Sequence, residues 1–240
     1  MKDIMKVFWR DQEVSMSRFF YAHEIAKPED VKSYLAKGEL HWKKGYSAHE
    51  LAHSWVNAGG IPAPVRSVLD SCPEYADATL VEGLFEREVD LRTPGRRSQT
   101  DLLAFIRCTH GDAVIAVEGK VEEPFGELVY VWNDHSPGRK RRLKALCTSL
   151  GLRVNDVGHN IRYQLLHRTV SAIYEAQRYR TTRAMMLVHS FSATDASFGD
   201  FQAFAMSLGI PVQAVNQVSG ERECEGIRLR LAWVKDQPIK

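Results

Sequence analysis

The amino-acid sequence predicts a mixed α/β (α+β) protein, in which helices flank a central mixed β-sheet. The first observation is the order of its segments: a helix, three strands, two helices, a strand, a helix and closing strands follow one another. The second is composition, since 240 residues with 44% hydrophobic and 26% charged side chains can bury one sizeable core.

The first part of the chain predicts a lead-in and the first helices. We expect residues 1–46 to form a polar lead-in that packs on one compact domain spanning 47–240. Within it, KPEDVKSYL predicts a short helix, because Pro28 suits a first helical turn. SAHELAHSWVN predicts the first core helix over 47–57, which AGGIPAP ends. APVRSVLDSC predicts a second short helix.

Three strands are expected next. LFEREVDLRT alternates in hydropathy and predicts a strand over 84–93, followed by the loop PGRRSQ. TDLLAFIRC and AVIAVEGKV are apolar runs joined by THGD, which predicts a β-hairpin with strands over 101–108 and 113–121. If the turn is centred on His110 and Gly111, Asp101 lies opposite Lys120.

The remaining segments complete the predicted sheet and its cover. Two helices are expected over 139–150 and 160–179, and RAMMLVHSF predicts a buried strand over 184–191. SFGDFQAFAMSLGI then predicts a helix, and VQAVNQV and GIRLRLAWV predict closing strands.

Charge and cysteine content narrow the function class. The net charge of +2 predicts no global attraction to nucleic acid, so basic clusters have to be judged locally. The four cysteines lie far apart without a C-x-x-C pair, which argues against a disulfide framework or a thiolate zinc site. The first residues lack the apolar segment of a signal peptide, and no later run is apolar enough to span a bilayer. We therefore expect a cytoplasmic protein.

The hairpin ends in a group of charged residues. Glu118 and Lys120 are two positions apart on one strand, so their side chains point to the same face, and Asp101 begins the partner strand. Two carboxylates offer oxygen ligands to Mg²⁺ or Mn²⁺, and a lysine can orient water near a phosphate. Because these residues end the apolar strands, we expect their charges to be removable at little cost to the core. The alternative is a salt-bridge cluster without catalytic consequence.

These residues resemble a known superfamily. Asp101, a turn and then Glu118-Gly119-Lys120 resemble the core of the PD-(D/E)XK nucleases, which have the restriction-endonuclease-like fold. More narrowly, GRRSQTDLL, VEGKVEEPFGE, RYQLLHRTVSA and HSF resemble an uncharacterised bacterial family assigned to that superfamily. The resemblance covers about residues 47–191 and implies an α-β-β-β-α-β core. It also implies that Asp101 and Glu118 are metal ligands and that Lys120 is the catalytic lysine. Thr100 precedes Asp101, where the superfamily often has proline.

The stretch GYSAHELAHSW admits three interpretations. His49-Glu50-x-x-His53 matches the H-E-x-x-H signature of zinc peptidases, in which both histidines bind the metal. Ser47 and Glu50 also match a capping box at the start of a helix. Members of the nuclease superfamily often add a glutamate from the first core helix, so Glu50 is a third candidate metal ligand. The metzincin continuation of the peptidase motif is absent, because Val56 and Gly59 stand in the required places.

Two segments carry candidate substrate-binding residues. GRR directly precedes the hairpin, and the helix NIRYQLLHRTVSA places polar side chains along one stripe. GRKRRLK adds basic residues at a helix start, for which a solvated face is the commoner explanation. We expect the following residues to bind substrate: Arg96, Arg97, Gln99, Arg162, Gln164, His167 and Arg168.

The sequence thus favours a Mg²⁺- or Mn²⁺-dependent nuclease with a role in repair or in defence against foreign DNA. Its expected partner is nucleic acid, DNA before RNA, and no membrane; a homodimer stays open, because many double-strand cutters dimerise. The alternatives are a binding module derived from the same fold without cleavage activity, and a zinc peptidase.

Overall fold

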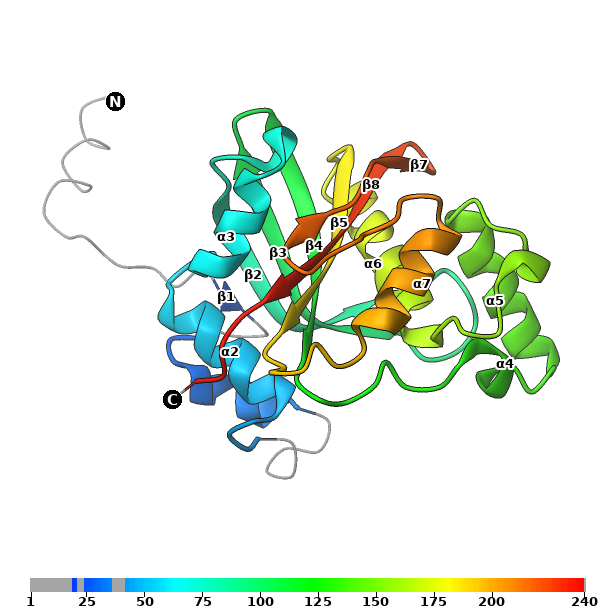
Figure 1. Ribbon diagram of the computed structural model, residues 1–240, viewed down its shortest axis with the longest axis horizontal. Coiled ribbons are helices and arrows are strands. Elements are labelled where there is room, and N and C mark those ends of the chain that lie inside the picture. The colour runs from blue at the N-terminus through cyan, green and yellow to red at the C-terminus, as the bar shows by residue number, and fades with distance from the viewer. Residues whose placement is uncertain (1–18, 21–23, 36–41, 240) are drawn as a thin grey trace, which may run out of the picture.

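The computed structural model describes residues 19–20, 24–35 and 42–239. The rest of the predicted lead-in lies outside the described residues. Within them, the centre of the molecule is an eight-stranded mixed sheet in the order β1-β2-β3-β4-β5-β8-β6, with β7 paired to β8 (Figure 1). The strands are β1 (Phe19–Phe20), β2 (Thr79–Val89), β3 (Ser98–Cys108), β4 (Gly111–Lys120), β5 (Arg183–Ser190), β6 (Gln217–Val218), β7 (Arg222–Cys224) and β8 (Ile227–Lys235).

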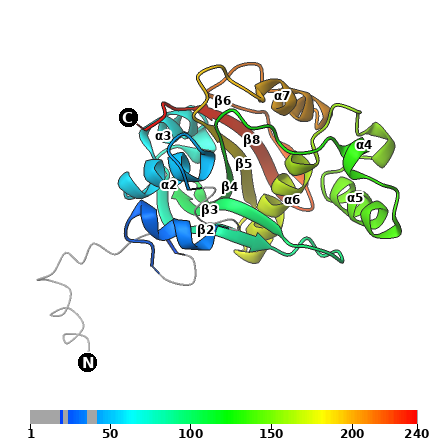
Figure 2. The same cartoon turned by 90° about the horizontal axis from the view of Figure 1, so that it is seen from below.

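The helices cover both faces of this sheet. They are α2 (Ser47–Asn57), α3 (Ala63–Asp70), α4 (Val129–Trp132), α5 (Pro137–Ser149), α6 (Tyr163–Arg178) and α7 (Phe198–Ser207), with the 3-10 turns η1 (Pro28–Tyr34), η3 (Pro73–Tyr75) and η4 (Val154–Asp156). The order α2-β2-β3-β4-α6-β5 confirms the predicted mixed α/β class and its α-β-β-β-α-β succession. Figures 1 and 2 show α2 and α3 on one side of the sheet, with α6 and α7 on the other.

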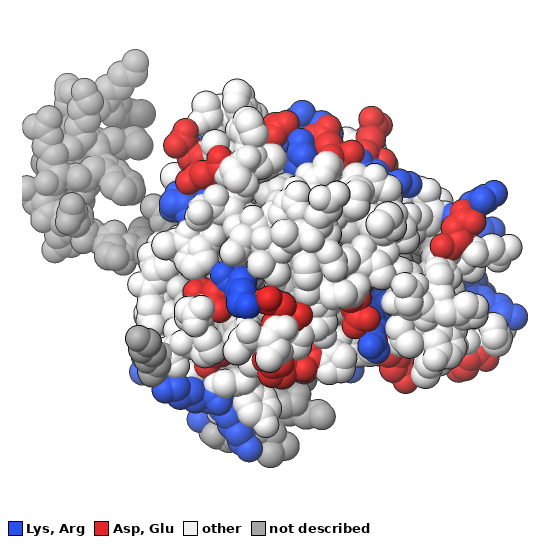
Figure 3. Space-filling view, viewed as in Figure 1, with Lys and Arg blue, Asp and Glu red and all other residues white. Residues whose placement is uncertain are grey.

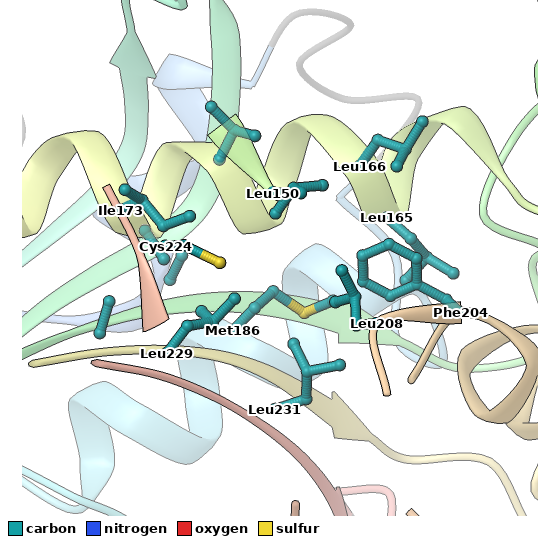
Figure 4. Close-up of a cluster of buried hydrophobic side chains, with 14 of the residues drawn as sticks. Leu150, Leu165, Leu166, Ile173, Met186, Phe204, Leu208, Cys224, Leu229 and Leu231 are labelled. Atoms are coloured by element: carbon teal, nitrogen blue, oxygen red, sulfur yellow. The ribbon is translucent and has the colours of Figure 1, made fainter. Parts of the chain in front are cut away.

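Each side has its own hydrophobic core. On the α2 side, Leu51 and Trp55 pack with Ile115 and Val117 of β4. The α6 side holds Val114 and Ala116 of the same strand, because successive side chains of a strand point to opposite faces. Figure 4 shows this second core, where leucines of α6 and β8 surround Met186 of β5. The central strands are therefore buried on both faces, as their continuous apolar runs predict.

The hairpin forms, but with a different register from the predicted one. Cys108 pairs with Gly111, so Thr109 and His110 alone make the turn, and Gly111 takes a φ of +104°. Leu102 consequently pairs with Val117, and Asp101 continues this register opposite Glu118 rather than opposite Lys120. The predicted pairing was wrong by two residues. A shift of two keeps every side chain on its face, since strands have period two.

Other boundaries differ where alternation breaks down. β2 begins at Thr79, earlier than the predicted 84, and its register with β3 shifts between Leu80 and Glu82. Such a bulge interrupts the period-two pattern on which the prediction rested. Of VQAVNQV only Gln217–Val218 forms a strand, and β7 was not predicted.

Candidate active site

Asp101 lies where β3 and β4 separate. Beyond the Leu102–Val117 pair, the Asp101 carboxylate accepts a hydrogen bond of 3.0 Å from the backbone N–H of Gly119. A Cβ on Gly119 would lie 3.3 Å from the carbonyl oxygen of Ser47, so the glycine lets the start of α2 approach β4. Glu118 and Lys120, on either side of this glycine, point to the opposite face, toward α6.

Glu118 and Lys120 form one buried polar group with α6. Glu118 is 2% exposed and Lys120 is 4% exposed. Lys120 Nζ donates to Glu118 Oε1 at 2.9 Å and to Gln164 Oε1 at 3.3 Å. Gln164 in turn donates to Glu118 Oε1 at 2.6 Å. Lys120 Nζ also stands 4.9 Å from the centroid of the Phe125 ring, which fixes the position of the ammonium group.

Arg168 joins the two carboxylates. Its Nε donates to Glu118 Oε2 at 2.5 Å and its Nη2 donates to Asp101 Oδ1 at 3.3 Å. Nη1 reaches Ser98 Oγ at 3.4 Å. Because one planar guanidinium spans both acids, Asp101 and Glu118 are close enough to share a single cation. The predicted site residues Asp101, Glu118, Lys120, Gln164 and Arg168 are thus brought together.

The two carboxylates have opposite pKa shifts. Burial raises the pKa of Asp101 to about 7, and the charge of Glu118 adds to this rise. Burial would also raise the pKa of Glu118, but the charges of Arg168 and Lys120 outweigh it and lower that pKa to about 2. Near neutral pH, Glu118 is therefore ionised while Asp101 exchanges its proton. A cation bound near the pair would therefore favour the ionised form of Asp101, whereas Glu118 is already ionised.

Glu86 of β2 was missed by the sequence analysis. It continues the β2–β3 register opposite Asp101, and Gln99 donates to its carboxylate at 2.6 Å. Its φ is +53°, an uncommon conformation for a glutamate inside a strand. Burial, with the charge of Asp101, raises the pKa of Glu86 to about 8. The pattern LFEREV carries no signal for this, because burial of Glu86 depends on its neighbour across the sheet.

Above this group lies a pocket of about 950 Å³ between the β2–β3 connection, α5 and the start of α6. Six of its lining residues are cationic and one, Glu127, is acidic. The cationic residues are Arg96, Arg97, Lys120, Arg139, Arg142 and Arg168. The GRKRRLK segment is therefore not wholly the solvated face that its composition suggests, because Arg139 and Arg142 line the pocket. On the face drawn in Figure 3, acidic and basic side chains are otherwise interspersed.

Aromatic rings form one wall of the pocket. Trp132 stacks on Tyr163 with ring centroids 3.7 Å apart, and Tyr163 lies 4.9 Å from His167. Arg142 donates to the Tyr163 hydroxyl at 2.6 Å. His167 Nδ1 is 2.8 Å from Ser98 Oγ, and burial together with the charge of Arg168 lowers its pKa well below the usual value. The imidazole is therefore neutral at pH 7.

Arg162 does not belong to this wall, although the sequence analysis grouped it there. Its Nε pairs with Asp200 of α7 at 2.9 Å and its Nη1 donates to the carbonyl of Gly126. These contacts tie the start of α6 to two neighbouring segments. The other predicted substrate-binding residues, Arg96, Arg97, Gln99, Gln164, His167 and Arg168, line the pocket.

Glu50 is placed away from the carboxylate pair. It lies on α2, across the sheet from Glu118, and is fully buried. Its two oxygens accept hydrogen bonds from the backbone of Gly45 at 2.8 Å and of Ile239 at 2.6 Å. Tyr46 rather than Ser47 is the N-cap of α2, so the predicted capping box does not form. Through these two hydrogen bonds, Glu50 instead connects Ile239, the last described residue, to the start of α2.

The histidines of the H-E-x-x-H stretch pack against each other and against Trp42. The rings of His49 and His53 are 4.2 Å apart, and His53 lies 3.8 Å from Glu29. Within the residues that the structure describes, no three or more His, Cys, Asp or Glu side chains are grouped as metal ligands. This holds for the peptidase motif as well as for the pocket.

Comparison with known proteins identifies the family. The family model described as "Domain of unknown function (DUF6946)" matches residues 24–238, and the chain belongs to that family. Neither the curated proteins nor the solved structures give a match. Over the ranges described by the structure, no helix has the length and apolar character needed to cross a membrane.

Proposed function

We propose that the protein is a cytoplasmic, Mg²⁺- or Mn²⁺-dependent nuclease of the PD-(D/E)XK type that hydrolyses phosphodiester bonds. One observation carries this proposal: Lys120 and Arg168 line the floor of a pocket whose walls carry four further arginines, and the carboxylates of Glu118 and Asp101 lie in direct contact with these two residues. Phosphodiester cleavage needs positive charge around the phosphate and an oriented water, and both requirements find side chains here.

The donor set fits Mg²⁺ or Mn²⁺ better than zinc. These hard ions are commonly held by one or two carboxylates, with waters and substrate phosphates completing the shell. Asp101 and Glu118 supply such a pair, and both already contact one cationic group, Arg168. The ion, when bound by these two residues, would polarise the phosphate and offset charge on the leaving oxygen. Zinc sites need three or four protein ligands, which the pocket does not assemble from its described residues.

The protein's own groups perform the remaining tasks. Lys120 donates from a fixed position and can orient the attacking water, because Glu118, Gln164 and the Phe125 ring hold its ammonium group. Arg96, Arg97, Arg139 and Arg142 neutralise phosphates above the floor. The contact between Arg168 and Asp101 has to break when a divalent ion binds to the carboxylates. The Arg168 guanidinium can then donate a hydrogen bond to a phosphate oxygen.

The same Arg168 contact favours a second candidate function. With Asp101 and Glu118 ionised, Arg168 and Lys120 already balance their charge, so the group is stable without a metal. A module that binds nucleic acid through the arginines but does not cut it would have this arrangement. Its DNA partner and a homodimeric state remain part of the proposal in either case.

Cleavage assays separate the two candidates. Labelled DNA and RNA, single and double stranded, are incubated with the protein in Mg²⁺, Mn²⁺ or EDTA. We expect metal-dependent products from the wild type and none from Asp101→Asn or Glu118→Gln. Asp112→Asn is the matched control, since Asp112 lies at the far end of β4 and pairs with Arg107. Binding without cleavage under any metal would reject the nuclease and favour the binding module.

A further inference from the structure

The burial of the floor residues limits which nucleic acid can reach them. Glu118 and Lys120 keep only 2% and 4% of their exposure, so a phosphodiester has to enter the pocket to meet them. The pocket has a volume of about 950 Å³. That is near the upper end of the ~300–1,000 Å³ typical of pockets that enclose a small molecule. A flexible single strand can place one phosphodiester in such a pocket, whereas a duplex has to bring its paired strand along.

One side of the pocket is bordered by the β2–β3 connection and α5. Figure 2 shows the β2–β3 connection extending from the sheet on the side where α4 and α5 lie. A Cβ placed on Gly95, at the tip of this connection, would be 3.5 Å from Arg142 Nη1 of α5. The tip thus lies close to the Arg142 side chain of α5, and residues of both segments line the pocket.

The walls offer the two kinds of contact that an unpaired strand uses. Arg96 and Arg97 come from the β2–β3 connection, and Arg139 and Arg142 come from α5. The stacked rings of Trp132 and Tyr163 also line the pocket, with His167 beside Tyr163, and the Arg139 guanidinium lies over the Trp132 ring, 5.4 Å from its centroid. Proteins that bind single strands combine a basic groove for the backbone with aromatic rings for bases that are free to stack. In a duplex the bases are already stacked on each other.

We propose that the substrate of this site is an unpaired segment of nucleic acid, which enters with its phosphates on the arginines and its bases along the Trp132–Tyr163 wall. This inference rests on the proposed function and specifies its substrate class. A blunt or covalently closed duplex lacks such a segment, whereas single strands, overhangs and frayed ends present one.

Binding without metal tests the inference independently of cleavage. Fluorescence anisotropy in EDTA compares a labelled 12-nucleotide single strand, as DNA and as RNA, with a blunt-ended duplex formed by the same strand and its complement. We expect the single strand to bind at least about tenfold more tightly. Trp132→Ala should weaken single-strand binding about fivefold or more, since base–aromatic stacking is a substantial part of such affinity. Trp132→Phe, which keeps a ring, should restore most of it.

Matched variants guard against unfolding as an explanation. Tyr130→Ala removes an aromatic ring two residues away that is 55% exposed and outside the pocket, and it should leave affinity unchanged. Arg142→Gln should reduce the salt dependence of single-strand binding by about 0.7 in log–log slope, the share of one phosphate contact. Arg141→Gln, at the exposed neighbouring position, should not.

The outcomes distinguish this inference from the proposed function. Equal or tighter binding of the blunt duplex, or equal effects of Trp132→Ala and Tyr130→Ala, would overturn it. Single-strand binding without cleavage of any substrate would support it while rejecting nuclease activity. Metal-dependent cutting of a covalently closed duplex as fast as of a linear single strand would support the nuclease and overturn the substrate class.

Discussion

Replacing Arg168 with methionine removes the guanidinium that joins Asp101 and Glu118. The side chain is 10% exposed and donates to three partners, Glu118, Asp101 and Ser98. Methionine retains much of its length but leaves the Glu118 carboxylate with only Lys120 and Gln164 as donors. Breaking one partner of a buried ion pair costs about 3–5 kcal/mol, because a charge stays buried without its counter-charge.

This cost predicts a measurable change in thermal stability. For domains of this size, 1 kcal/mol lowers Tm by about 2–4 °C, so Arg168→Met should melt about 6–20 °C below the wild type at pH 8. The loss should be smaller at pH 6, where Asp101, with a pKa of about 7, takes up a proton. Mn²⁺ should raise the Tm of Arg168→Met more than that of the wild type, because the guanidinium no longer competes for the carboxylates.

The assay is a melting series by differential scanning calorimetry, with and without Mn²⁺, at both pH values. Arg141→Met is the control, since it replaces an exposed arginine and should stay within about 0.5 kcal/mol of the wild type. If Arg168→Met melts within 2 °C or so of the wild type at pH 8, Arg168 does not hold the two carboxylates together. A Mn²⁺ shift no larger than that of the wild type would refute the shared cation position.

Three further predictions follow from the same geometry. In urea titrations, the free energy of unfolding of the metal-free protein should fall from pH 5 to 8, by up to about 1.4 kcal/mol per pH unit for each proton. The reason is that the folded state retains protons on Asp101 and Glu86 (pKa about 7 and 8) that the unfolded chain has already released. Asp101→Asn should flatten this slope, and an unchanged slope would contradict the assignment. Glu50→Gln should leave Mn²⁺ affinity in calorimetric titrations unchanged. It should lower the free energy of unfolding by about 1–3 kcal/mol, because the amide donor would face a backbone N–H. Weakened metal binding would indicate that Glu50 is a metal ligand after all. Gly119→Ala should lower the free energy of unfolding by about 1–3 kcal/mol, because the added Cβ meets the Ser47 carbonyl. Gly199→Ala is the control, since a Cβ at Gly199 points into open space and should have no such effect. Equal effects of the two substitutions would contradict the close approach of α2 to β4.

The face of each site residue could be predicted from the sequence, whereas the register could not. Glu118 and Lys120 share a face because strands have period two, and this property survives any even shift. The register depends on where the turn is centred, and THGD allows a two-residue turn on His110–Gly111 as well as one on Thr109–His110. The structure uses Thr109–His110, and continuing this register places Asp101 opposite Glu118.

The cost of removing the site charges likewise depends on contacts that the sequence does not reveal. Their position at strand ends suggested that the core would tolerate their loss. Instead, Glu118 accepts hydrogen bonds from Lys120, Gln164 and Arg168 in a buried setting. Gln164 and Arg168 come from α6, 46 and 50 positions later, and only the packing of α6 on the sheet brings them near. Glu118→Gln should therefore destabilise the protein, while Asp101→Asn should not.

The assignment of Glu50 fails for a third reason. A local pattern, Ser47 followed by Glu50, matches a capping box, but a backbone N–H from the other end of the described chain competes for the same carboxylate. Sequence spacing carries no information about such a distant partner. Glu86 and Arg168 illustrate the reverse case, where distant partners turn ordinary surface residue types into buried members of the site.

The central claim is that Asp101 and Glu118 hold a metal ion while Lys120 serves the chemical step. Single-turnover cleavage of a labelled single strand by Lys120→Ala, with Mn²⁺ affinity measured on the same preparation, tests it most directly. The account predicts that Lys120→Ala binds Mn²⁺, since both carboxylates remain, yet cleaves at least about a hundredfold more slowly than the wild type. Cleavage at the wild-type rate would contradict the role of Lys120, and loss of Mn²⁺ binding with both carboxylates intact would contradict the metal site.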